Sequence, residues 1–121
     1  SEQVHRLLRG YNRQFWRGLR DYDFHIKEEG RIVAGIVARS CFETLELEFL
    51  FVDEGHRGRG YGHQLLHHVE EAARADGLKQ VLLNTYSFQA PGFYEKEGYS
   101  LLFCIENAFG EYGQWFFRKE L

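Results

Sequence analysis

The sequence has few of the residues that would place it in a disulfide-bonded, metal-binding or membrane class. It contains two cysteines, Cys41 and Cys104, and neither has a CxxC partner or a histidine at metal-ligand spacing. Both are expected to be reduced, as in cytoplasmic proteins, and the sequence leaves a disulfide between them open. No apolar run approaches the roughly 20 residues that span a bilayer, and no signal-peptide pattern opens the chain. We therefore expect a cytoplasmic protein without membrane association.

The chain also lacks the positive charge typical of nucleic-acid-binding proteins. Its formal net charge is −3 at pH 7, which disfavours nucleic acid as the main ligand. Internal repeats, low-complexity segments and Pro/Ser-rich linkers are missing as well. What remains is a globular composition with 44% hydrophobic and 17% aromatic residues. We expect residues 1–121 to form one domain with a single core.

Hydrophobic periodicity predicts the order helix, three strands, helix, strand, helix and two strands. The first helix is expected at roughly 3–18, and a hairpin follows with its turn at Glu29-Gly30. Gly77 is expected to end the central helix, and Pro91 to begin the last one. Hairpins with inserted helices favour an α+β fold, with a mixed, mostly antiparallel sheet of about six strands flanked by helices. The unit at about 45–86 is expected to be a right-handed parallel crossover.

The clearest strand is "TLELEFLFV", where apolar residues alternate with others. Strict alternation places Leu45, Leu47, Phe49 and Phe51 on one face, and Glu46, Glu48, Leu50 and Val52 on the other. A β-bulge in this strand would change the facing of one of the two glutamates.

Directly after this strand, three glycines and two arginines precede an amphipathic helix in "HRGRGYGHQLLHHVEEAARADG". A helix N-terminus offers unpaired N–H groups and a partial positive charge, and glycine lets a ligand approach the backbone. The stretch therefore predicts a pyrophosphate-binding turn. It does not fit the P-loop, because no Gly-Lys-Ser/Thr occurs, and it fits the dinucleotide fingerprint poorly, because it reads GxGxG after a Leu/Glu-alternating strand. A glycine-rich surface turn without a ligand is the remaining interpretation.

Two motifs together resemble the GNAT superfamily of acetyl-coenzyme A-dependent N-acetyltransferases. "RGRGYG" matches the Q/R-x-x-G-x-G/A signature, and "NTYSFQAPGFYEKEGY" resembles the second motif, especially that of a bacterial subgroup with SFQAPxFYEKxGY. The likeness extends over almost the whole chain. It implies the GNAT fold and transfer of an acetyl group from acetyl-coenzyme A to a primary amine by direct attack.

The resemblance also implies a cofactor site, without a metal. Pyrophosphate would bind the backbone of the glycine turn, and pantetheine would lie between two diverging strands. Gln89 stands where many relatives have an asparagine. The implied cofactor-binding residues are Leu50, Phe51, Val52, Arg57, Gly58, Arg59, Gly60, Tyr61, Gly62, His63, Asn84, Gln89, Phe93 and Tyr94.

Acetyl transfer requires a neutral amine, a donor to the oxyanion and a proton for the leaving thiolate. Tyr94 matches the superfamily's general acid, and its alternative role is that of a core aromatic. Glu46 and Glu48 are the candidates for a general base, and the alternative is a solvated strand face or a reaction without an essential base. Aromatic residues either wall the acceptor pocket or belong to the core: Phe15, Trp16, Tyr22, Phe109 and Trp115.

Three questions stay open at this stage. The chain is either a transferase or a non-catalytic coenzyme A-binding sensor or interaction module, with a purine nucleotide-binding protein as a third reading. The acceptor is a small-molecule or peptide amine of unknown identity. A homodimer is open, with the last two strands as one surface that pairs across a two-fold axis.

Overall fold

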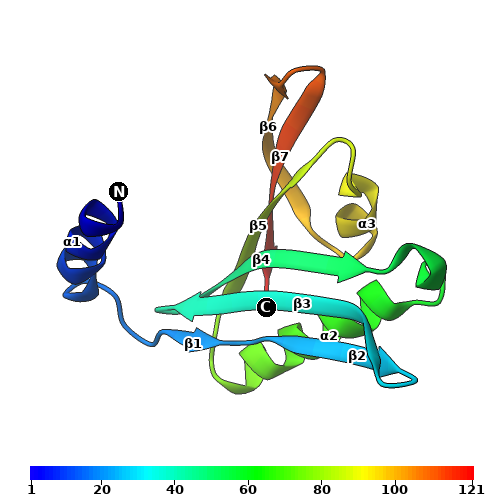
Figure 1. Cartoon of the computed structure of the whole chain (residues 1–121), viewed down its shortest axis with the longest axis horizontal. Coiled ribbons are helices and arrows are strands. Elements are labelled where there is room, and N and C mark those ends of the chain that lie inside the picture. Colours follow the sequence, from blue (N-terminus) through cyan, green and yellow to red (C-terminus); the bar gives the residue numbers. More distant parts are fainter.

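The computed structural model describes residues 1–121, and Figure 1 shows a single twisted sheet with α2 and α3 against it. The sheet has seven strands in the order β1-β3-β4-β5-β7-β6, and β2 also pairs with β3. All neighbours are antiparallel except β4 and β5, which are parallel. The predicted α+β architecture is confirmed. The elements are α1 (Glu2–Arg13), β1 (Arg20–Asp21), β2 (Phe24–Glu28), β3 (Arg31–Cys41), β4 (Thr44–Val52), η1 (Glu54–His56), α2 (Tyr61–Ala75), β5 (Gln80–Tyr86), α3 (Pro91–Lys96), β6 (Ser100–Phe109) and β7 (Tyr112–Glu120).

The β2–β3 hairpin turns where its sequence predicts. Glu29 and Gly30 have φ angles of +51° and +76°, and two consecutive positive φ values are typical of the tight turns that join twisted strands. The sequence did not indicate β1, because two residues are too few for any periodic pattern. The sheet consequently has one more strand than expected.

The facing of β4 differs from the strict alternation. Val37 pairs with Phe49 but Ala38 pairs with Leu47, so Glu48 is an extra residue in β4. This bulge reverses the pattern beyond it: Leu45, Leu47, Leu50 and Val52 face the core, whereas Glu46, Glu48, Phe49 and Phe51 are exposed. The prediction that Phe49 and Phe51 share a face with Leu45 was therefore wrong. Both glutamates remain on the outer face.

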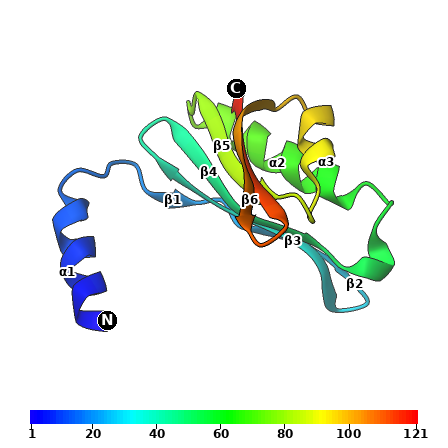
Figure 2. The ribbon, with the colours of Figure 1, turned by 90° about the horizontal axis from the view of Figure 1, so that it is seen from above.

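The core lies between the sheet and α2, with α3 on the same side of the sheet (Figure 2). Leu66 and Val69 of α2 are fully buried together with Leu45, Ile36 and Phe117 of the strands. The predicted helix stop is confirmed, since Gly77 follows the last turn with a φ of +83°.

The sequence analysis missed a polar group inside this core. Glu70 lies on the buried side of α2 and is 2% exposed. Its carboxylate accepts hydrogen bonds from the Tyr99 hydroxyl at 2.6 Å and from Lys119 Nζ at 3.0 Å. Lys119 also donates to the carbonyl of Glu97 at 2.8 Å. The network therefore joins α2, the end of α3 and β7, and Tyr99 has a structural role.

The N-terminal helix is shorter than predicted and stands clear of the sheet in both views (Figures 1 and 2). It ends at Arg13 rather than near residue 18, and none of its residues is buried. Arg17 closes it by donating to the carbonyls of Gln14 and Trp16 at 3.0 and 2.9 Å. None of the helices has the length and apolar character needed to cross a membrane.

Candidate functional site

Two neighbouring strands part in the middle of the sheet. β4 and β5 pair only from Thr44↔Gln80 to Glu46↔Leu82, although β4 continues to Val52 and β5 to Tyr86. Figure 1 shows β5 rising away from the line of β4. Because β5 stays paired with β7 along its whole length, the second half of β4 has a strand neighbour on one side only. This gap is bordered by residues that the sequence analysis placed beside a cofactor, namely Leu50 to Val52 and Asn84.

The glycine turn lies at the end of β4 and presents backbone donors. Gly58 and Gly60 have φ angles of +82° and +79°, and a Cβ on either would meet no atom within 4 Å. The first bond of α2 runs from Gln64 N–H to the Gly60 carbonyl at 3.0 Å. The N–H groups from Gly58 to His63 have no acceptor within the chain. Such a run at a helix N-terminus is suited to binding an anion.

The third glycine has a different role. A Cβ on Gly62 would lie 3.4 Å from the Phe93 ring and 3.8 Å from Val52 Cγ2. The absence of a side chain there lets α2 pack closely against α3 and the end of β4. Gly62 therefore brings Phe93 of the second motif beside the glycine turn of the first.

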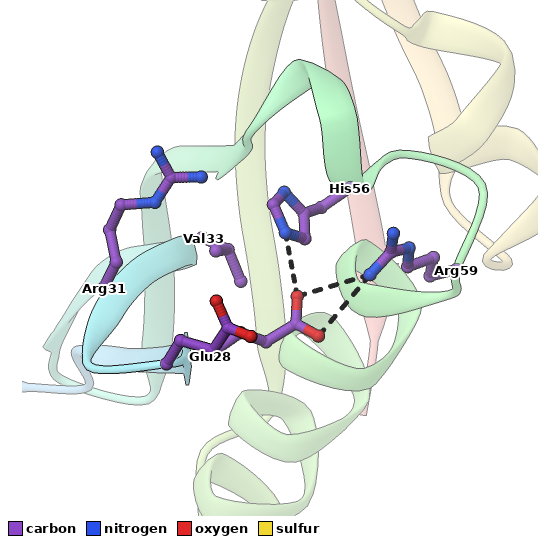
Figure 3. Close-up of a pocket in the computed structure, with 6 residues that line it drawn as sticks. Glu28, Arg31, Val33, His56 and Arg59 are labelled. Carbon is purple, nitrogen blue, oxygen red and sulfur yellow. Dashed lines mark hydrogen bonds and ion pairs between the residues drawn. The ribbon is translucent and has the colours of Figure 1, made fainter.

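A charged cluster that the sequence analysis did not find braces this turn (Figure 3). His56 lies between two carboxylates: its Nδ1 is 2.9 Å from Asp53 Oδ2, and its Nε2 is 2.9 Å from Glu28 Oε2. Arg59 reaches the same Glu28 at 3.4 Å. A polar cavity of about 350 Å³ lies between the β2–β3 hairpin and the turn, and its lining consists of Glu28, Glu29, Arg31, Val33, His56 and Arg59.

The cluster holds the turn against the hairpin through charged hydrogen bonds. The hydrogen bond to His56 lowers the pKa of Asp53, and Arg31 at 3.8 Å acts in the same direction. Beside it, Arg57 donates from Nε to the Val52 carbonyl at 3.2 Å, which ties the turn to the end of β4. The sequence analysis assigned no role to Glu28. Its role depends on a residue 31 positions away, so no local pattern could reveal it.

Tyr94 combines a buried ring with a free hydroxyl. The residue is 7% exposed, and its ring packs against Phe93, Tyr99 and Phe117. Its hydroxyl has no hydrogen-bond partner within the chain. Because no fully buried side-chain polar atom lacks a partner, this hydroxyl oxygen is not completely buried. Burial raises the pKa of Tyr94 to about 12, which keeps the phenol protonated at neutral pH.

This shift predicts a loss of stability in alkali. The folded pKa of about 12 exceeds the unfolded value of 10.0, so the unfolded chain releases this proton first as the pH rises. The free energy of unfolding should therefore fall between pH 10 and 12, with about 2 kcal/mol attributable to Tyr94. Urea denaturation across this range should show a shallower fall in Tyr94→Phe. An equal fall in both proteins would contradict the prediction.

The remaining predicted site residues are placed as follows. Glu46 stands at the last pair of β4 with β5, and Glu48 at the bulge just beyond it, both exposed. Gln89 accepts hydrogen bonds at Oε1 from the Thr85 hydroxyl and the Tyr86 N–H, at 2.9 and 3.0 Å, which leaves its amide nitrogen free of protein partners. His63 contacts Glu97, 2.6 Å from its Nδ1.

The aromatic residues considered for an acceptor wall do not come together within one chain. Tyr22 is buried and donates to Asp76 at 2.6 Å, and Trp115 packs against the core. Phe15 and Trp16 lie exposed beyond the end of α1, and Phe109 contacts Tyr86 at the other end of the molecule. The core interpretation therefore holds for Tyr22 and Trp115.

The site thus combines a parted mixed sheet with an amide-lined glycine turn at its opening, an arrangement suited to an anionic ligand. The family description "Acetyltransferase (GNAT) family" matches residues 2–99. The chain belongs to this family, as its two motifs indicated.

Relatives and solved structures agree with this placement. The blasticidin-S acetyltransferase of Streptomyces morookaense is 39% identical over 79 residues, which cover 64% of this chain and 58% of that protein. The IAA acetyltransferase of Azospirillum brasilense is 39% identical over 70 residues, covering 56% and 43%. A crystal structure of an acetyltransferase from Bacillus cereus is 35% identical and superimposes with a TM-score of 0.88, over 99% of this chain and 90% of that one. The matched region thus spans less than two thirds of these curated relatives.

Proposed function

We propose that this chain is an N-acetyltransferase that moves the acetyl group of acetyl-coenzyme A to a primary amine by direct attack. The observation that carries the proposal is the row of unbonded N–H groups from Gly58 to His63 beside the gap between β4 and β5. Family membership and the names of the two curated relatives support acetyl transfer.

The residues present fit acetyl-coenzyme A as the co-substrate. The free amides and the side chains of Arg57 and Arg59 would hold the pyrophosphate, with Tyr61 as the first residue of α2 beneath it. The pantetheine amides would pair with the unpartnered side of β4 at Leu50, Phe51 and Val52. Asn84 and the free amide nitrogen of Gln89 would contact it from β5, and Phe93 would line the same groove.

Tyr94 is the proposed general acid. When the amine nitrogen forms its bond to the acetyl carbon, the carbon–sulfur bond breaks and the electron pair leaves on sulfur. A phenol whose pKa burial raises to about 12 stays protonated at neutral pH, and its partner-free hydroxyl can donate that proton to the thiolate. No hydrogen bond within the protein competes with the thiolate for this hydroxyl.

Glu46 and Glu48 are the proposed bases, one of which accepts the proton of the amine, directly or through water. Both lie on the outer face of β4 at the place where β5 departs. In Glu46→Gln and Glu48→Gln, the variant that lacks the base should lose about 10²-fold in rate at neutral pH. The loss should shrink as the pH approaches the pKa of the amine, because the substrate then arrives deprotonated. If both variants kept the activity of the wild type, a reaction without a general base would be favoured.

A coenzyme A-binding module without transferase activity is the second candidate, because the same turn would serve it. Calorimetric titration with acetyl-coenzyme A, followed by measurement of thiol release with a panel of amines, separates the two. A transferase binds and then releases thiol with at least one amine, whereas a module only binds. Absence of binding would contradict both, and protection by ATP alone would favour a nucleotide-binding protein.

A further inference from the structure

The outer surface of α1 carries a complete apolar stripe that no part of its own chain covers. The stripe consists of Val4, Leu7, Leu8 and Tyr11 and continues in Phe15 just beyond the helix. Each of them is at least half exposed, and Leu7 reaches 68%. Three arginines, Arg6, Arg9 and Arg13, lie on the opposite side of the helix, as the 3.6-residue period requires. A helix of 12 residues is marginally stable alone in water, so this stripe needs a partner.

The sheet has an uncovered face of matching character. α2 and α3 occupy one side, and on the other side Phe49 is 67% exposed and Phe51 54%. Phe103 and Phe116 stack at 4.5 Å between ring centroids, farther along the sheet. Phe116 faces the side opposite its buried neighbour Phe117, so the pair extends the same outer face. We call the surface formed by Phe49, Phe51, Phe103 and Phe116 the open face.

The total exposed area of the chain is larger than that of a compact monomer of the same mass. The chain exposes 8325 Å², whereas a compact monomer of 14.3 kDa exposes about 6,800 Å². The excess of about 1,500 Å² is well above the roughly 800 Å² that each partner buries in a standard protein interface. An arrangement that buried most of it in two chains at once would fall in the range of stable homodimers.

The link between α1 and the sheet decides which chain supplies the cover. The Arg17 carbonyl accepts from Phe42 N–H at 2.7 Å, and the Gly18 carbonyl accepts from Ser40 Oγ at 2.6 Å, which fix the chain beside the β3–β4 turn. The Arg17 side chain also donates to the carbonyls of Gln14 and Trp16, in the link just after the helix. With the link held at this point, α1 stands clear of its own open face (Figures 1 and 2). A second copy can cover the stripe while α1 keeps this position.

We propose that α1 is exchanged between two copies of this chain, so that the apolar stripe of each helix covers the open face of the other. The exchange is reciprocal about a two-fold axis, which satisfies both surfaces in each copy and closes the assembly. It differs from edge pairing of β6, since bulges after Leu101 and Ile105 interrupt that strand's register. Glu46 and Glu48 are exposed on the same side of β4 as the open face, so the partner's helix would also border the acceptor side, a consequence that rests on the proposed function.

The test is the mass in solution, measured by sedimentation equilibrium at micromolar concentration. The wild type should have about twice the mass of one chain. Leu7→Asp in the stripe and Phe49→Asp in the open face should each weaken association by at least about 100-fold, because a carboxylate would be buried without a partner. Arg6→Asp places the same group on the far side of α1 and should leave the dimer intact. Leu7 and Phe49 are both exposed in a single chain, so replacing either by aspartate does not disturb the core.

A monomeric wild type would overturn the proposal, as would a dimer that survives both Leu7→Asp and Phe49→Asp. If α1 folded onto the sheet of its own chain, the wild type would have the mass of a monomer. Calorimetric titration of acetyl-coenzyme A into the wild type and Leu7→Asp separates this inference from the proposed function. A monomer that binds refutes only the exchange, and a dimer that does not bind refutes only the function.

Discussion

Replacing Gly60 by valine is expected to lower the affinity for acetyl-coenzyme A by at least about 100-fold, the equivalent of about 2.7 kcal/mol. Gly60 has a φ of +79°, which costs an L residue about 1–2 kcal/mol and more when the side chain is β-branched. The open space beside its Cα is where the phosphates would approach the free amides. Isothermal titration calorimetry measures the affinity directly.

Gly110→Val is the matched control. Gly110 also has a positive φ, +62°, and a Cβ on it would also meet nothing within 4 Å, but it lies in the β6–β7 turn. The two variants should therefore lose similar stability in urea denaturation, and only Gly60→Val should lose affinity. If both bound acetyl-coenzyme A like the wild type, the glycine turn would not be the phosphate site.

The second large effect is expected from Tyr94→Phe, which should lower kcat by about 10²–10³-fold with little change in the KM for acetyl-coenzyme A. The substitution removes only a hydroxyl that has no hydrogen-bond partner, so the free energy of unfolding near neutral pH should change by less than about 1 kcal/mol. Steady-state measurement of thiol release with an accepted amine gives both constants.

Tyr99→Phe should behave in the opposite way. Its hydroxyl donates to the buried carboxylate of Glu70 at 2.6 Å, and loss of this bond should cost about 1.5–3 kcal/mol of stability. It should leave kcat nearly unchanged, because that hydroxyl is engaged inside the core. Burial and the bond to Glu70 both raise the pKa of Tyr99, so it releases no proton at neutral pH. If Tyr94→Phe kept its full kcat, water would be the proton source and Tyr94 a core residue.

Local patterns predicted those parts of the fold that local physics controls. The Glu29-Gly30 turn, the stop at Gly77 and the start of α3 at Pro91 each depend on the backbone preferences of one or two residues. The alternation of "TLELEFLFV" identified β4 for the same reason. It failed to give the facing of Phe49 and Phe51, because a bulge is set by pairing with β3 and leaves no trace in the alternation.

The candidate site divides in a similar way. The glycine turn and Tyr94 belong to short contiguous motifs, so the sequence contained them. The bracing of the turn by Glu28 and His56 brings together residues that are distant along the chain, and the partner-free state of the Tyr94 hydroxyl depends on what packs around it. The free amides from Gly58 to His63 were expected from the helix start, but their lack of acceptors is a property of the folded chain.

The sequence by itself determined the family, the order of the elements apart from β1 and the place of the glycine turn, because each follows from residue type and spacing within a short segment. Only the tertiary structure decided that β4 and β5 part after Glu46, that Glu70 is buried in a polar network and that α1 stands clear of its own sheet. These features depend on which surfaces, distant along the chain, come into contact. A hydrophobic pattern indicates that a surface is buried, but it does not identify the segment that buries it.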